Sequence, residues 1–308
     1  MSAHDVAVQP VSQATAAHHH DKVAAHGHTH SAAGAAPSLR QPRWPAIAGR
    51  QAVPMNAVTD LGTHDWVDRT GGQLTGADRR SLLRPLARTH AVNAAGRLSM
   101  LARLNSGLRA EVDPARLVPP SSALTRAAVE QAQRRLSPAL LNHSYRTFAF
   151  GAALGALEGL TVDRELLFAA ALLHDTGLPT SERNVDFTRN SARVARDVAD
   201  EVGLSSDATE TMRTAITLHH SPRVTLAHGP VAYLLSAGAG VDVVGLRSWQ
   251  LPPDVLASVL VQHPRLGFKD EFTAAFRAEA ARVPRGRAQF LRRYGAFDLA
   301  IKLAPFDS

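Results

Sequence analysis

The sequence predicts an all-α protein, and three observations lead to that fold class. Apolar residues recur at steps of three and four along much of the chain, which is the period of a helix face. Serine, proline and glycine stand where helices begin and end. Aromatic residues make up only 5% of a chain that is 45% apolar, so Ala, Leu and Val must fill the core, and alanine favours helices over strands.

The first segment, residues 1–55, is expected to be a disordered tail rich in alanine and histidine, without apolar periodicity. Seven of the 15 histidines precede residue 31, several of them in HHHDKVAAHGHTH. A flexible metal-binding tail and a low-complexity tail without a defined role are both open. We favour the second, because an unfolded cluster of ligands has no surrounding groups to fix its geometry.

The second segment, residues 56–120, is predicted to be a helical N-terminal extension followed by a strap. Residues 76–110 form one or two amphipathic helices, since Leu82, Leu86, Leu98 and Leu101 follow helical spacing. Pro85 kinks or starts a helix. Residues 111–122, EVDPARLVPPSS, are too rich in proline for regular structure, and Ser121 or Ser122 can cap the next helix.

The third segment, residues 121–308, carries the clearest helix signals. Ser137 and Pro138 supply an N-cap and a first-turn proline, and Gly177 fits a helix stop after VDRELLFAAALLHDTG. Ser206 is expected to cap the helix that follows Gly203. The remaining predicted helices cover about 190–202, the stretch after Gly229-Pro230, the stretch after Pro252-Pro253, 270–282 and 286–300.

Composition excludes several classes of protein. The absence of cysteine rules out disulfides, thiolate zinc sites and cysteine nucleophiles, and it favours a cytoplasmic location. No apolar run approaches the roughly 18 residues that span a bilayer, and the first residues lack the features of a signal peptide, so we expect no membrane partner. The net charge of +7 comes mostly from residues 1–120, with 13 basic and 8 acidic residues, so a nucleic-acid partner is not expected.

The candidate chemistry begins with His174 and Asp175, which are adjacent in ALLHDTGL near a helix end. Where the backbone relaxes at a helix terminus, both side chains can turn toward one ion. An imidazole beside a carboxylate suits zinc, iron or manganese. The alternative is a histidine that interacts with the helix dipole beside a capping aspartate.

Two further residues strengthen the metal hypothesis. His143 lies one predicted helix earlier, in an apolar stretch, where it could also be an ordinary core histidine. Asp242 lies among glycines and valines, and a buried unpaired carboxylate is costly. A metal ion would offset that cost, and so would an arginine elsewhere in the chain.

The order H…HD…D on successive helices resembles the motif of the HD superfamily of metal-dependent hydrolases. The sequence around these residues resembles the cyanamide hydratase-like branch of that superfamily. The similar phrases are LSPALLNHSYRTFAFG, FAAALLHDTGLP, AITLHH and GAGVDVVGLR, and the resemblance covers roughly residues 115–305. It implies an HD-domain helical bundle in which one divalent metal ion, zinc first and iron or manganese as alternatives, is held by His143, His174, Asp175 and Asp242.

The resemblance also implies an activity, the addition of water to cyanamide to give urea. The residues alone imply only a water activated by a metal ion. His219 and His220 are the candidate catalytic residues: His219 falls on the inward helix face and could move a proton, or it could be a core histidine. Asp186 and Phe187 are weaker candidates for lining the pocket.

Two other functions remain open. A phosphohydrolase would use the same metal site with arginines on the phosphate, for which Arg146 and Arg247 are candidates. A non-catalytic helical module that binds nucleic acid has few aromatic side chains for stacking on bases. A small-molecule substrate is the expected partner, and a homo-oligomer stays open.

Overall fold

The computed structural model describes residues 60–180 and 182–308, and the predicted tail over residues 1–55 lies outside them. The all-α prediction is confirmed: the described residues form twelve α-helices joined by short 3₁₀ turns. An isolated β-bridge joins Gln73 to Gly286. No helix among the described residues is both long and apolar enough to cross a membrane.

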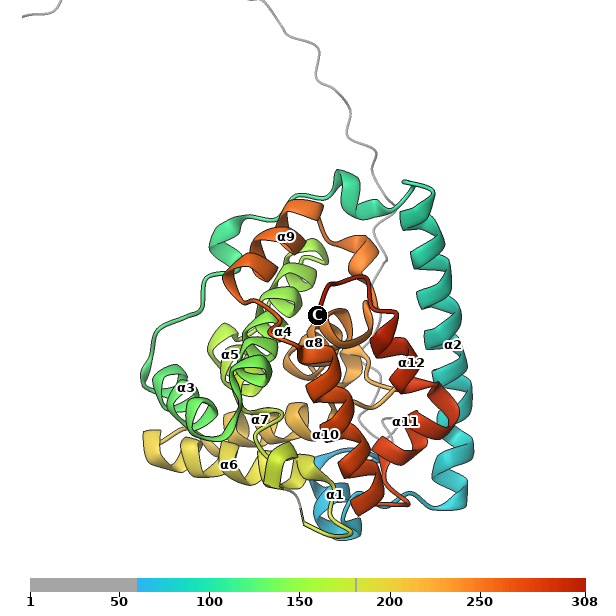
Figure 1. Ribbon diagram of the computed structural model, residues 1–308. Coiled ribbons are helices and arrows are strands. Elements are labelled where there is room, and N and C mark those ends of the chain that lie inside the picture. The colour runs from blue at the N-terminus through green and yellow to red at the C-terminus, as the bar shows by residue number, and fades with distance from the viewer. Residues whose placement is uncertain (1–59, 181) are drawn as a thin grey trace, which may run out of the picture. The chain divides into compact units, whose positions relative to one another are not determined.

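Two helices, α4 (Pro138–Leu157) and α8 (Pro230–Val244), pack against each other at the centre of the molecule (Figure 1). Glycines make this close approach possible, because they carry no Cβ atom. A Cβ atom on Gly238 would lie 2.1 Å from the carbonyl oxygen of Thr147, and one on Gly151 would lie 2.7 Å from that of Leu234. This packing brings His143 of α4 beside Asp242 of α8.

Gly238→Ala is therefore expected to destabilise the fold by about 1–3 kcal/mol, because overpacking must push the two backbones apart. Denaturant unfolding measures the loss. The control is Gly240→Ala in the same helix, where the new Cβ would meet only the Leu246 side chain, at 3.3 Å. Equal stability of the two variants would show that the backbones are not held in this contact.

Helices α5 (Arg164–Leu173) and α7 (Ser206–Leu218) pack on the central pair, and α3 (Ala123–Arg135) and α6 (Phe187–Val202) pack against these two. Their ends follow local rules. The side chain of Ser122 caps α3 and that of Ser137 caps α4, as predicted. Gly203 ends α6 in the left-handed conformation, also as predicted.

Several predicted boundaries are wrong. Helix α5 ends at Leu173, four residues before Gly177. Gly177 instead allows the turn after α5 to approach α6, because a Cβ atom at this position would lie 2.3 Å from the Phe187 carbonyl oxygen. Ser205 caps α7 in place of Ser206. The single helix predicted over 286–300 is divided at Ala296, which adopts a φ of 44°.

The N-terminal extension contributes α1 (His64–Thr70) and a long helix, α2 (Gly76–Leu101), which accommodates Pro85 without a break. Helix α9 (Pro253–Gln262) follows the central pair in the chain. The C-terminal helices are α10 (Phe268–Arg282), α11 (Arg287–Gly295) and α12 (Phe297–Lys302). In Figure 1, α2 runs along α11 and α12 at the edge of the molecule.

Hydrogen bonds to backbone carbonyl groups hold this extension to α8 and to the C-terminal segment. The Leu74 N–H donates to the Arg285 carbonyl at 2.8 Å. Arg97 of α2 donates to the carbonyl oxygens of Leu303 at 2.8 Å and Val244 at 2.7 Å. The extension is therefore part of the wall around the central helices.

Candidate metal centre

Three side chains meet at the buried end of α5. The potential ligand atoms of His143, His174 and Asp175 all lie within 4.8 Å of one another, and each residue is at most 1% exposed. The two Nε2 atoms are 3.2 Å apart, and Oδ2 of Asp175 lies 3.3 Å from His174 Nε2 and 3.6 Å from His143 Nε2. The helix ends at Leu173, which allows His174 and Asp175 to face the same point although they are neighbours in sequence.

Three histidines, His143, His174 and His219, surround Asp175, and each directs its Nδ1 atom toward an oxygen atom outside the cluster. His174 Nδ1 lies 2.7 Å from the Ala171 carbonyl oxygen, and His219 Nδ1 lies 2.7 Å from that of Ile216. His143 Nδ1 lies 2.7 Å from Oδ2 of Asp242. Because Nδ1–H is the donor in these contacts, the Nε2 lone pairs of all three rings remain available, as in histidines that bind metals.

Asp242 lies on the far side of the His143 ring from Asp175. Arg146 donates to its carboxylate twice, from Nε at 2.8 Å and from Nη2 at 2.9 Å, and Arg265 Nη1 donates at 2.6 Å. The sequence left open an arginine as the partner of Asp242, and the structure shows two, Arg146 and Arg265. In this arrangement Asp242 orients His143, and it is not among the three residues that converge.

Electrostatics favour the metal-binding forms of His143, His219 and Asp175, whereas the pKa of His174 is raised by the adjacent Asp175 although burial alone would lower it. Burial lowers the pKa of His143, and burial together with the nearby His174 lowers that of His219 well below its usual value, so both rings stay neutral. Although burial alone would raise it, the adjacent His174 holds the pKa of Asp175 below its usual range. Neutral imidazole and ionised carboxylate are the species that coordinate a cation.

A divalent ion fits this set of atoms. Both carboxylate oxygens of Asp175 are buried without a hydrogen-bond donor, which is costly for an ionised group. Two imidazole lone pairs that face each other at 3.2 Å also repel unless a cation lies between them. Ligands about 2.1 Å from a tetrahedrally bound zinc ion lie roughly 3.4 Å from one another, close to the spacing of these atoms.

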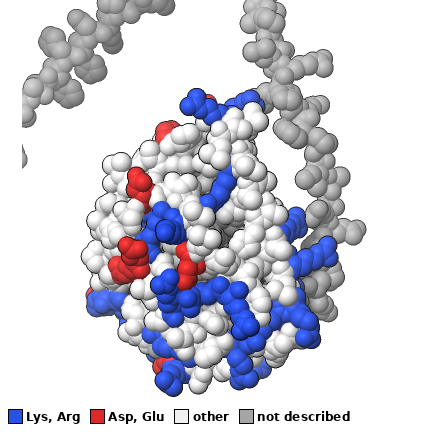
Figure 2. Space-filling model, turned by 45° about the vertical axis from the view of Figure 1, so that its right-hand side comes forward, with Lys and Arg blue, Asp and Glu red and all other residues white. Residues whose placement is uncertain are grey.

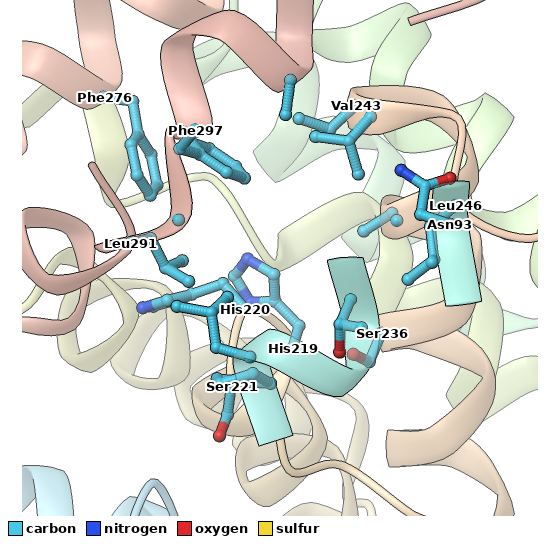
Figure 3. A pocket seen from close by; sticks show the side chains of 18 of the residues that line it. Asn93, His219, His220, Ser221, Ser236, Val243, Leu246, Phe276, Leu291 and Phe297 are labelled. Carbon is cyan, nitrogen blue, oxygen red and sulfur yellow. The ribbon is translucent and has the colours of Figure 1, made fainter. Parts of the chain in front are cut away.

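The cluster forms the floor of a cavity of about 140 Å³. Its walls come from α2, α8 and the three C-terminal helices. Figure 3 shows Phe276 and Phe297 on one side of the cavity, Val243 and Asn93 on the other, and His219 nearby. Sequence reasoning missed the contributions of α2 and α10–α12, because no local pattern shows which distant helices meet over a site.

His220 also lines the cavity, and its ring has no hydrogen bond on either nitrogen although its side chain is only 7% exposed. The ring stacks on Phe187 at 5.3 Å between centroids. Burial, and next the charge of Arg287, lower the pKa of His220 well below its usual value. The ring therefore stays neutral, and its Nε2 lies 3.7 Å from Oδ2 of Asp186.

Asp186 and Phe187 do not line the cavity, contrary to the sequence-based suggestion. Asp186 caps α6 and accepts a hydrogen bond from Nε of the buried Arg287 at 3.0 Å. A Cβ on Gly72 would lie 2.3 Å from that of Asp186, so the α1–α2 loop packs directly on this pair. The role of Asp186 is structural support beneath His220.

Fold and site together define a helical protein with a buried histidine-aspartate cluster, and residues 140–259 match the family model of the HD domain. The matched segment is an HD domain, which supports a metal-dependent enzyme. The chain is similar to cyanamide hydratase DDI2 and cyanamide hydratase DDI3 of Saccharomyces cerevisiae. Each is 26% identical over 181 residues, covering 56% of this chain and 80% of the relative.

Proposed function

We propose that the protein is a cyanamide hydratase-like enzyme that adds water to a nitrile group. The observation that carries the proposal is the pair of orphaned Asp175 oxygens beside three imidazole Nε2 atoms, at the floor of a cavity whose lining contains no Lys or Arg among the described residues. An uncharged substrate such as cyanamide suits that lining. The proposal includes zinc as the ion and the cytoplasm as the location.

The residues have distinct roles in this proposal. His143, His174 and Asp175 hold the ion, and Asp242 either joins them or keeps the Nδ1 proton of His143 in place. When bound, a divalent ion lowers the pKa of water and polarises the nitrile. His219 and His220 move a proton toward the nitrogen of the substrate, and Phe276 and Phe297 exclude bulk water.

The alternative phosphohydrolase reaction has less support. Arg146 is fully buried in its ion pair with Asp242, and Arg247 pairs with Glu158 and Tyr233. On the face shown in Figure 2, Lys and Arg gather over the lower half of the surface. Neither arginine that was a candidate for binding phosphate lines the cavity.

Metal analysis combined with two assays tests the proposal. The purified full chain is expected to contain about one equivalent of divalent metal and to convert cyanamide to urea. Removal of the ion with a chelator should abolish urea formation, and adding zinc back should restore it. Phosphate release from nucleotides or phosphomonoesters without urea formation would replace the hydratase assignment with the phosphohydrolase one.

His219→Ala is expected to keep the metal ion while turnover falls on the order of 10²–10⁴-fold, the usual cost of losing a proton carrier. His219 lies outside the group of three converging ligands, with Nε2 3.6 Å from Asp175 Oδ1. Metal content and urea formation are the measurements. Loss of the ion would make His219 a ligand, and full turnover would make it a core histidine.

His220→Phe is the companion variant, because phenylalanine preserves the ring that stacks on Phe187 and removes both nitrogens. It should also retain the ion and lose turnover. Unchanged turnover would remove His220 from the proton path.

A further inference from the structure

The cavity above the cluster is larger than cyanamide requires. Its volume is about 140 Å³, and an engineered apolar cavity of about 150 Å³ in another protein holds a benzene molecule. Cyanamide has only three non-hydrogen atoms. A substrate of that size would leave most of the space beside the cluster unfilled, and empty apolar space forgoes packing contacts.

The walls beyond the cluster are mostly hydrocarbon. Phe276, Leu291 and Phe297 come from three successive C-terminal helices, and Val243 and Leu246 come from the end of α8 and the turn after it. Figure 3 shows these two groups facing each other across the cavity, with His219 and His220 beside them. Aromatic and branched aliphatic side chains in two opposed walls suit a flat apolar group.

Ten of the 23 residues that line the cavity lie outside the matched HD domain. Helices α10–α12 follow residue 259, and α2, which contributes Leu86, precedes residue 140. The helices that carry the cluster and the helices that shape the space above it are therefore partly different. The shape of the substrate can be set by the second group without any change to the first.

We propose that the substrate is a nitrile or substituted cyanamide whose substituent is apolar and about the size of a benzene ring, held between the Phe276–Phe297 wall and the Val243–Leu246 wall. This inference rests on the proposed hydration for the reacting end of the substrate. The binding of the ring does not depend on it. For a substituted cyanamide, the reaction adds one water across the C≡N bond: oxygen bonds to carbon, both protons end on nitrogen, and the product is a substituted urea.

The test compares cyanamide with benzylcyanamide, which carries the same reacting group and adds the ring. Calorimetric titration of the metal-free full chain measures binding apart from catalysis, and urea and benzylurea formation by the metal-loaded protein measures turnover. Benzylcyanamide is expected to bind the metal-free protein about 10- to 100-fold more tightly, because the ring is removed from water. It should also have the higher kcat/KM.

Val243→Phe fills the cavity from the α8 side and should remove the preference for benzylcyanamide over cyanamide in both measurements. Val261→Phe is the matched control, since Val261 is 83% exposed on α9 and lies outside the cavity. If Val243→Phe does not fold, Ala300→Leu places the added bulk on the opposite wall, from α12.

The outcomes separate the two proposals. Binding of benzylcyanamide that Val243→Phe abolishes, without any hydration, keeps the apolar subsite and overturns the hydratase function. Hydration of cyanamide without preference for the ring in either measurement keeps the hydratase function and overturns the subsite. An equal loss of ring preference in Val243→Phe and Val261→Phe also overturns the subsite.

Discussion

Asp175→Ala is expected to abolish metal binding and to reduce urea formation to background. Asp175 supplies the carboxylate that faces His143 and His174, and no described donor satisfies either of its oxygens. Without it, two neutral imidazoles are left to hold the ion. Metal content by elemental analysis and the rate of urea formation check the result. Asp197→Ala, at an exposed site on α6, is the control for loss of an aspartate.

The stability of this variant should differ from that of His174→Ala. Asp175→Ala removes a buried charge that has no hydrogen-bond donor, so part of the cost of losing the ion is offset. His174→Ala also weakens the ion but leaves the Asp175 charge buried. His174→Ala should therefore have the lower melting temperature. Full metal content in Asp175→Ala would contradict the proposed site, and a higher melting temperature for His174→Ala would contradict the charge argument.

Arg146→Met should lower the free energy of unfolding by about 3–5 kcal/mol, because it leaves the buried charge of Asp242 without its main partner. The Arg146 guanidinium is completely buried. It holds both oxygens of Asp242 and also donates to the carbonyl oxygens of His263 and Pro264 at 3.0 and 3.2 Å. Methionine fills similar space without any donor.

Arg277→Met provides the matched control, because Arg277 forms an ion pair with Asp298 while 58% exposed. An exposed pair contributes only about 0–1 kcal/mol. Denaturant unfolding of both variants measures the difference. The double variant Arg146→Met/Asp242→Asn should be more stable than Arg146→Met alone, because it removes the stranded charge. Equal losses in Arg146→Met and Arg277→Met would show that Arg265 alone satisfies Asp242.

The sequence could predict most helices because their signals are local. Ser122, Ser137 and Gly203 act through the backbone within three or four residues, so the pattern in the sequence contains the interaction. The break at Ala296 had no such signal, since alanine rarely adopts positive φ and is a strong helix former. Gly177 was wrongly predicted to end a helix. Its actual role is a close contact with α6, and the sequence around Gly177 does not show which helix packs on it.

The same distinction applies to the site. His174 and Asp175 are adjacent, His143 lies one predicted helix earlier, and the resemblance implied that all three bind one ion, so their convergence could be expected. Which face of His143 meets Asp242 depends on the glycine-mediated packing of α4 on α8, and the second arginine, Arg265, comes from a loop beyond α9. Such contacts between side chains cannot be deduced from spacing along one chain.

The hydrogen bonds between the N-terminal extension and the C-terminal helices have a consequence for biosynthesis. Leu74 pairs with Arg285, and Arg97 with Leu303, so α2 makes these contacts only after residues 285–303 have left the ribosome. The three converging residues, His143, His174 and Asp175, come from earlier parts of the chain, although His143 also stacks on Phe268 of α10. The cavity above these residues therefore stays open to solvent until α10–α12 have been synthesised and packed.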